Sequence, residues 1–181
     1  MGILEFKRIM RDVKEQEFDC GVESINNMIK ESYYPFITQH AYTYSIYYEK
    51  YLIGYIQILL RDIMLYSFPE DIADTDPGVK NDTVTSVHIN FLAIDQKWQG
   101  KKLGTTALKM MIQHIRALAK ELPIRVITID ARQELEQWYE SIGFKKMLED
   151  FDGQEGYNVA MYIDCIINIE ELEEYLQSVY E

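Results

Sequence analysis

The chain has 181 residues, of which 48% are hydrophobic, and its 30 acidic and 18 basic residues leave a formal net charge of -12. No apolar run approaches the roughly 20 residues of a membrane-spanning helix, the N-terminal segment lacks a signal-peptide core, and the length suits a single domain over residues 1–181. The acidic balance disfavours nucleic acids as partners, because their binders usually present a basic surface, and it suits an amine-bearing or cationic substrate. We therefore expect a soluble, cytoplasmic protein without a membrane partner.

The first part of the chain predicts a strand, a helix and a β-hairpin. Residues 5–10 have a strand-like pattern. Apolar side chains over residues 18–33 recur at spacings of three and four, which predicts an amphipathic helix that ends near Pro35. Aromatic and β-branched residues are frequent over 42–48 and 52–60, and the short connection between these two runs predicts a hairpin.

Residues 61–83 have a different composition, with two prolines, a glycine and six acidic residues. We expect a loop-rich insertion there. The regular alternation then resumes with a strand at 84–94 and a long helix over 103–118. The inner face of this helix is predicted to consist of Leu103, Ala107, Met110, Met111, His114 and Leu118.

The last third of the chain continues the alternation of strands and helices. We expect a strand at 125–130, a helix at 134–142 capped by Gly143, a hairpin of 144–148 with 159–163, and an acidic C-terminal helix at 166–181. The inner face of the helix at 134–142 would consist of Leu135, Trp138, Tyr139 and Ile142. This order, without repeats or low-complexity linkers, predicts an α/β fold with a mixed sheet and helices on both faces.

A strand, a short polar loop and a helix start follow one another from Phe91 to Gly104, where the chain reads FLAIDQKWQGKKLG. The first N–H groups of a helix have no intrahelical partner and carry a partial positive charge, so they can hold a phosphate. A P-loop would need a Lys followed by Ser or Thr, and a dinucleotide fingerprint would need three glycines in register; this segment has neither. It therefore predicts an anion site for a phosphorylated cofactor.

The same residues resemble motif A of the GNAT acyltransferases, Gln/Arg-x-x-Gly-x-Gly/Ala, with Gln99 and Gly104 matching and Lys102 in place of the middle glycine. Further likenesses cover most of the chain: Phe18-Asp19-Cys20-Gly21 with Asn26-Asn27, Leu52-Ile53-Gly54-Tyr55, Leu92-Ala93-Ile94-Asp95 and Trp138-Tyr139-Glu140-Ser141-Ile142-Gly143-Phe144. The phrases around Cys20, Gly54 and Asp95 resemble the branch that contains the acetyltransferase toxins of toxin–antitoxin modules. The resemblance implies the GNAT fold, an α/β (α+β) single domain with a central mixed, mostly antiparallel sheet flanked by helices.

The resemblance also implies acetyl-CoA as the cofactor. The pyrophosphate of coenzyme A would lie on the helix start, and its pantetheine arm would pair with the free backbone groups of the preceding strand, one of whose N–H groups would face the thioester oxygen. The implied cofactor-binding residues are Leu92, Ala93, Ile94, Gln99, Gly100, Lys101, Lys102, Leu103, Gly104 and Thr105. Lys102 either adds a charge beside the pyrophosphate or marks a loosened site.

Two residues are catalytic candidates. Tyr139 matches the family tyrosine that protonates the thiolate of coenzyme A; the alternative is an aromatic residue on the buried face of its helix. His88 is a candidate general base, because it shares with Asn90 the side of its strand that could face a substrate, while Val87, Ile89 and Phe91 project to the other side. The alternative is a structural histidine, and many enzymes of the family remove the proton through ordered water instead.

Three functions remain open at this point. The first is an acetyl-CoA-dependent N-acetyltransferase that acts on a primary amine of a small molecule or a protein. The second is a toxin-like acetyltransferase that modifies aminoacyl-tRNA, so tRNA is not excluded as a partner, and the third is a non-catalytic acyl-CoA-binding module. A homodimer is among the oligomeric states left open. Cys20 and Cys165, far apart and without metal-ligand neighbours, are expected to be packing residues, and no metal site is predicted.

Overall fold

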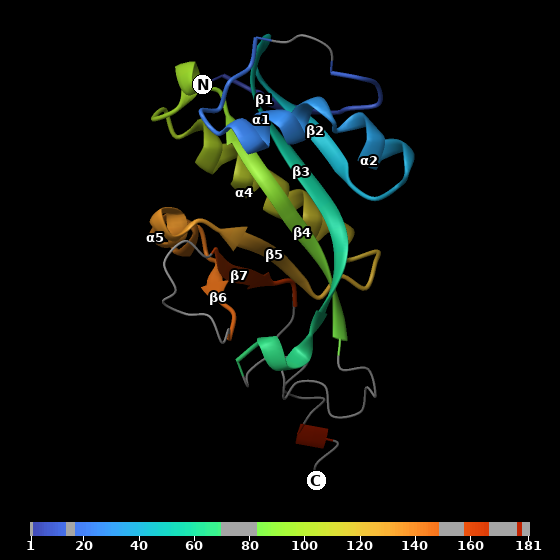
Figure 1. Cartoon of the computed structure of the whole chain (residues 1–181). Helices are drawn as coiled ribbons and strands as arrows, with labels where there is room; N and C mark the ends of the chain where they lie inside the picture. Colours follow the sequence, from blue (N-terminus) through green and yellow to red (C-terminus); the bar gives the residue numbers. More distant parts are fainter. Residues whose placement is uncertain (1, 14–16, 70–82, 149–157, 167–176, 179–181) are drawn as a thin grey trace. The chain divides into compact units, whose positions relative to one another are not determined.

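The computed structural model describes residues 2–13, 17–69, 83–148, 158–166 and 177–178. The chain divides into two compact units, one of Met1–Arg61 with Val87–Ala117 and the other of Asp62–Ser86 with Leu118–Glu181, and each is described by itself (Figure 1). None of the helices in the described ranges is long and apolar enough to cross a membrane.

In the first unit the strands lie in the order β1-β2-β3-β4. They span Leu4–Arg8 (β1), Tyr42–Tyr48 (β2), Tyr51–Met64 (β3, as far as Arg61) and Thr83–Ile94 (β4, from Val87). Strand β2 pairs antiparallel with both β1 and β3. The predicted hairpin is confirmed: Tyr48 pairs with Tyr51, and the chain turns at Glu49, which has a positive φ of 57°.

Helices α1 (Glu23–Lys30), α2 (Tyr33–Ile37) and α4 (Leu103–Leu118) complete this unit. Figure 1 shows α1 and α4 on opposite faces of strands β3 and β4. On the α1 side, the core cluster consists of Ile9, Cys20, Ile29, Tyr55, Phe91 and Ala93. On α4, the buried residues are Ala107, Leu108, Met111, Ile112 and Ile115. The sheet is therefore covered on both faces, as the mixed α/β class requires.

In the second unit the order is β4-β5-β7-β6, beginning with the first residues of β4. The elements are the short 3-10 helices η1 (Leu65–Ser67) and η3 (Gln133–Leu135), helix α5 (Glu136–Glu140), and strands β5 (Val126–Ala131), β6 (Lys145–Lys146) and β7 (Val159–Asp164). Strand β7 pairs antiparallel with β5 and β6, which confirms the predicted hairpin of the last two strands. The core cluster consists of Ile63, Phe68, Val126 and Tyr162.

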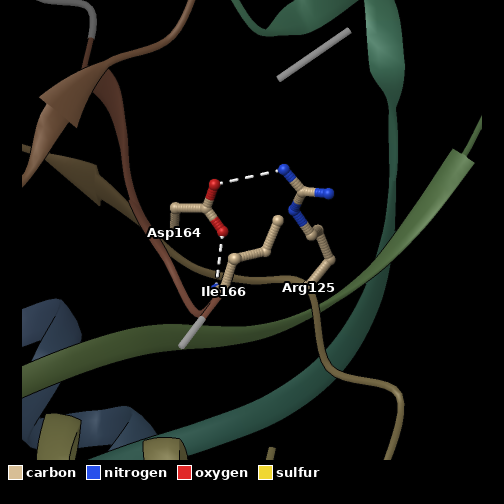
Figure 2. A network of polar contacts seen from close by, with 3 residues as sticks. All are labelled: Arg125, Asp164 and Ile166. Carbon is tan, nitrogen blue, oxygen red and sulfur yellow. Dashed lines mark hydrogen bonds and ion pairs between the residues drawn. The ribbon is translucent and has the colours of Figure 1, made fainter. Parts of the chain in front are cut away.

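An ion pair fixes the edge at which β5 and β7 meet. The Arg125 Nη2 atom lies 3.1 Å from Asp164 Oδ2, and Asp164 Oδ1 accepts a hydrogen bond of 2.9 Å from the Ile166 backbone N–H. Figure 2 shows that one carboxylate makes both contacts. Because Val126 pairs with Asp164, these contacts lie at the first position of the β5–β7 ladder and hold its register.

The predicted helix over residues 18–33 is wrong at both ends. Helix α1 begins only at Glu23 and ends at Lys30. Residues 18–21 belong to a loop whose backbone is hydrogen-bonded to Asp95 and Gln99. Pro35 does not end a helix but is the third residue of α2. A proline is tolerated in the first turn because the N–H that it lacks would have no intrahelical partner there.

Two further predictions are corrected. Residues 61–64 are not part of a loop, because β3 continues to Met64 and buries Ile63. His114, predicted on the inner face of α4, is exposed, and Leu108, Ile112 and Ile115 are buried in its place. The apolar residues of this helix fit two overlapping faces, and the face that is buried includes Leu108, Ile112 and Ile115. The periodicity of the helix does not show which of the two faces the sheet covers.

The predicted helix at 134–142 is a 3-10 turn followed by the short α5, and Leu135 is 37% exposed rather than on the inner face. Both cysteines are buried, as predicted for packing residues. Most of the expected acidic C-terminal helix and of the insertion, and the turns between β6 and β7, lie outside the described residues.

Candidate functional site

The loop and helix start over residues 95–105, which we call the cradle, follow β4 directly. Asp95 begins the 3-10 helix η2 (Gln96–Trp98), and its Oδ1 accepts a 2.9 Å hydrogen bond from the Lys97 N–H. The chain then turns through two residues with positive φ, Gly100 at 74° and Lys102 at 60°, and α4 begins at the next residue. The strand, loop and helix start predicted from the sequence are thus confirmed.

Two glycines allow close packing at the cradle. A Cβ atom on Gly54 of β3 would lie 2.3 Å from the Ala93 carbonyl oxygen and 2.8 Å from Ile94 Cδ1. A Cβ atom on Gly104 would lie 3.3 Å from Ile94 Cγ1. The first of these contacts is with backbone, which cannot rotate away, so β3 approaches the end of β4 only because residue 54 is a glycine.

A polar network joins the cradle to the loop before α1. Asp19 accepts hydrogen bonds from the Gly21 N–H (2.7 Å), the Asn26 amide (2.8 Å) and the Gln96 amide (3.0 Å). The Gly21 bond is the main cause of a lowered Asp19 pKa, and the Asn26 bond adds to it. Asp95 in turn accepts from the Asp19 N–H at 3.3 Å. Two phrases that resemble the GNAT proteins therefore lie in contact, although 76 positions separate Asp19 from Asp95.

Two predicted cofactor residues hold the cradle together through their side chains. The Gln99 amide nitrogen donates to the carbonyl oxygens of Ile94 (2.8 Å) and Cys20 (3.0 Å). The Lys101 ammonium donates to the Lys97 carbonyl oxygen at 3.0 Å and lies 4.5 Å from the centre of the Trp98 ring. The Gln99 amide N–H groups are thus already used within the protein, which points to a positioning role for this side chain.

Lys102 adopts the backbone conformation that its motif assigns to glycine. We expect Lys102→Gly to relieve a strain of about 1–2 kcal/mol, offset by roughly 0.5–1 kcal/mol of extra unfolded-state entropy, for a small net stabilisation. Lys101→Gly, at a position without positive φ, should instead destabilise. Urea unfolding of both variants checks this, and an equal loss of stability in the two would contradict it.

Tyr139 is buried in α5, in the second unit. Its ring centre lies 4.6 Å from that of Trp138 and 5.5 Å from that of Phe144, and its side chain is 5% exposed. The helix ends at Glu140, and in the turn that follows, Gly143 has a positive φ of 115° and the Phe144 N–H donates to the Tyr139 carbonyl oxygen at 3.2 Å. Burial raises the pKa of Tyr139 to about 12, so its phenol is protonated at neutral pH.

His88 is 4% exposed in β4. The Arg61 Nη1 atom lies 3.4 Å from each of its ring nitrogens. A permanently charged guanidinium against the ring opposes uptake of a second positive charge, which a general base must accept. These surroundings favour the structural alternative for His88 over the catalytic one.

The first unit also contains a pocket of about 500 Å³ beside α1 and α2. Its lining residues are Asp12, Met28, Glu31, Tyr33, Tyr34, Pro35, Ile37, Gln57 and Asn90. Asn90 was expected to face a substrate together with His88, but His88 is not among them. The sequence carried no signal that these residues meet in one pocket, because they come from segments that are far apart along the chain and share no common spacing.

Strand β4 is irregular beside this pocket. Tyr55 and Gln57 lie two residues apart on β3 and so share a face. Tyr55 is in the α1 core cluster together with Phe91, while Gln57 Oε1 accepts a 2.6 Å hydrogen bond from Asn90. The neighbours Asn90 and Phe91 thus both reach the α1 side, and their predicted projection to opposite faces is wrong. Such local irregularities of a strand are frequent next to active sites.

Comparisons with known proteins agree with the fold described above. The family model for acetyltransferase (GNAT) domains matches residues 78–163, and no curated protein matches the chain. Among solved structures, a tyrosine-to-phenylalanine mutant of KacT has a TM-score of 0.73 at 19% identity, covering 95% of this chain and 98% of its own.

Two structures of AtaT are similar as well. AtaT complexed with acetyl-methionyl-tRNAfMet has a TM-score of 0.74 at 16% identity, with 99% of this chain and 100% of AtaT covered. A mutant AtaT toxin bound to the C-terminus of the antitoxin AtaR and to acetyl-CoA has a TM-score of 0.66 at 17% identity, with 97% and 99% covered. At this level of identity the likeness establishes the fold, and the predicted GNAT fold class is confirmed.

Proposed function

Because the chain carries an acetyltransferase domain of the GNAT family, we propose that it transfers the acetyl group of acetyl-CoA to a primary amine of a small molecule or a protein. The observation that carries this proposal is the cradle: α4 begins directly after a loop that leaves β4, and Lys102 keeps the conformation of the motif glycine. A helix of 16 residues presents its first N–H groups at this point, where a pyrophosphate is stabilised by hydrogen bonds and by the helix dipole.

We assign the parts of the cofactor to the cradle and to the end of β4. The backbone from Gly100 to Thr105 would bind the pyrophosphate, with the exposed Lys102 side chain adding a positive charge. The backbone of Leu92, Ala93 and Ile94 would pair with the pantetheine arm. Gln99 and Lys101 would hold this backbone in place, Gln99 through its bonds to Cys20 and Ile94 and Lys101 through its bond to Lys97. An N–H group of this strand would stabilise the thioester oxygen as negative charge develops on it.

The transfer itself is an aminolysis of a thioester. The lone pair of the neutral amine attacks the carbonyl carbon, a C–N bond forms, and the C–S bond breaks with its electron pair on sulfur. We assign Tyr139 the role of its GNAT counterpart, protonation of the departing thiolate, for which a phenol that stays protonated at neutral pH is suited. The amine proton leaves through ordered water, since the surroundings of His88 disfavour it as the base.

An aminoacyl-tRNA acceptor is the second candidate. It is supported by the similarity to AtaT, whose structure is a complex with acetyl-methionyl-tRNAfMet. The similarity to the AtaT complex with AtaR suggests an antitoxin as a protein partner. The formal charge of -12 opposes it, because a tRNA backbone is strongly anionic. The third candidate, a binding module without turnover, is disfavoured by the conformation of Lys102. A backbone strain of this kind persists where function requires it, and a loop that had lost its function would not be expected to retain it.

Binding and turnover can be separated in one set of measurements. We expect acetyl-CoA to raise the melting temperature, because a ligand that binds only the folded state stabilises it by mass action. We also expect release of free coenzyme A when a suitable amine is added. Stabilisation by acetyl-CoA without release of coenzyme A, over a panel of amines, peptides and aminoacyl-tRNA, would identify a binding module. Absence of any stabilisation would contradict the proposed cofactor.

A further inference from the structure

The described residues that line the pocket beside α1 and α2 carry a net negative charge. Two of them, Asp12 and Glu31, are acidic, and none of the described lining residues is basic. Both carboxylates belong to exposed residues, and among the residues that the structure describes neither forms an ion pair. A cation in this pocket would therefore be attracted without displacing an existing partner.

The position of Glu31 strengthens this attraction. Glu31 is the C-cap residue of α1, at the end where the helix dipole is negative and where a carboxylate is disfavoured. The Lys30 ammonium is on the last turn, but Lys30 does not line the pocket. A positively charged ligand would relieve the repulsion between the carboxylate and the helix end.

A buried network sets the polar floor of the pocket. Asn90 Nδ2 donates to Gln57 Oε1 at 2.6 Å, and Gln57 Nε2 donates to Thr43 Oγ1 at 2.8 Å. Gln57 and Thr43 are 4% and 0% exposed, so this end of the chain of bonds is shielded from water. Asn90 uses its nitrogen for Gln57, and within the described ranges its Oδ1 accepts no hydrogen bond. This oxygen is available to accept an N–H group of a ligand.

The pocket adjoins the strand assigned to the thioester. Asn90 and Leu92 are two residues apart on β4, so their Cα atoms lie at most about 7 Å apart, the reach of two extended residues. An amine held at Asn90 is therefore close to the backbone assigned to the pantetheine arm. The volume of about 500 Å³ is in the range of small-molecule sites.

The charge of the pocket limits what its ligand can be. An amine must lose its positive charge before it attacks a thioester, and a carboxylate beside it would stabilise the charged form instead. The carboxylates of Asp12 and Glu31 are thus unsuited to the reacting amine and suited to a second cationic group of the same molecule. The rings of Tyr33 and Tyr34, with Met28 and Ile37, provide apolar contacts for a chain between the two groups.

We propose that the acceptor is a small aliphatic diamine or polyamine, with its distal ammonium bound by Asp12 and Glu31 and its reacting amine at Asn90. This rests on the proposed acetyltransferase function and names its substrate class. The reaction joins the neutral end of the diamine to the acetyl carbon and releases coenzyme A as the thiol, while the distal ammonium stays charged throughout.

The test compares putrescine with butylamine, which has the same four-carbon chain and one charge fewer, and adds spermidine as a longer polyamine. Coenzyme A release is measured with putrescine, spermidine and butylamine for the full chain and for Asp12→Asn, Glu31→Gln and the double variant. We expect putrescine and spermidine to have a higher kcat/KM than butylamine, and each single variant to lower this advantage by about tenfold. The KM for acetyl-CoA should not change. Glu23→Gln, an exposed acidic residue at the start of α1 outside the pocket, is the matched control and should keep the advantage.

Binding of spermidine is measured by calorimetry as well, so that the inference is tested without turnover. Spermidine binding that weakens in Asp12→Asn and Glu31→Gln but not in Glu23→Gln supports the pocket even if no coenzyme A is released, a result that would count against the proposed function alone. Equal activity with butylamine and putrescine, or equal losses in the pocket variants and in Glu23→Gln, overturns the inference. Preference for methionyl-tRNA over all three amines overturns it too, while the acetyltransferase function stands.

Discussion

Tyr139→Phe is expected to lower the turnover number for acetyl transfer by about 10²- to 10⁴-fold, the usual contribution of a general acid. The variant lacks only the hydroxyl that we assign to protonation of the thiolate, and the ring contacts with Trp138 and Phe144 remain possible. The KM for acetyl-CoA should change little, because the phenol acts on the leaving group rather than on the bound ground state. Steady-state release of coenzyme A measures both quantities.

Loss of a buried hydroxyl needs its own control. Tyr162→Phe removes a hydroxyl from another buried tyrosine of the same unit, 1% exposed, and should keep its turnover number. Circular dichroism and the melting temperature establish that both variants fold. Undiminished turnover in a folded Tyr139→Phe protein would remove Tyr139 from the mechanism.

The raised pKa of Tyr139 gives a second, independent readout of the same variant. Since burial raises this pKa from 10.0 to about 12, the stability associated with the protonated phenol is fully present below pH 10 and is lost as the pH rises through 12. The loss should be about 2–3 kcal/mol in the wild type and absent in Tyr139→Phe. Urea unfolding at several alkaline pH values measures the difference between the two proteins.

Gly54→Ala should destabilise the first unit by about 3 kcal/mol and weaken acetyl-CoA binding. The new Cβ atom would lie 2.3 Å from the Ala93 carbonyl oxygen, so either β3 or the end of β4 must move. Ala93 belongs to the strand that we assign to the pantetheine arm, and its displacement would misplace the backbone groups that bind the cofactor. Urea unfolding and a titration with acetyl-CoA measure the two effects.

Gly104→Ala is the matched control for this substitution. Its Cβ atom would meet only a side-chain atom, Ile94 Cγ1, at 3.3 Å, and alanine raises helix propensity at this position of α4. Its change in stability should stay within about 1 kcal/mol. If Gly54→Ala is as stable as Gly104→Ala, the close approach of β3 to Ala93 does not hold the strand in place.

Features that depend on a few neighbouring residues were predictable from the sequence. The change from the period of a strand to that of a helix around residues 94–103 located the cradle, because both periods are written in consecutive residues. Gly143 similarly marked the turn that follows α5, where only a residue without a Cβ atom adopts a positive φ at low cost. The hairpin of β2 and β3 followed from two adjacent strand patterns.

Features that depend on contacts between distant segments were not predictable in this way. Pro35 was expected to end a helix, since local propensity does not say that a new helix begins at Tyr33. The extension of β3 to Met64 and the buried face of α4 depend on what the sheet covers, and not on the periodicity of either segment. The irregular pair Asn90 and Phe91 is another such case, because regular alternation is the default for any strand pattern.

The sequence by itself predicted the GNAT fold class, the position of the cradle and the candidate acid Tyr139, since short motifs and local periodicity carry that information. Only the tertiary structure decided that Gln99 supports the cradle, that Lys102 keeps a glycine conformation, and that His88 lies against Arg61. The pocket proposed for the acceptor is also a tertiary property. Asp12, Glu31, Gln57 and Asn90 are separated along the chain by loops and helices, and only packing of α1 and α2 beside β3 and β4 brings their polar groups to one cavity.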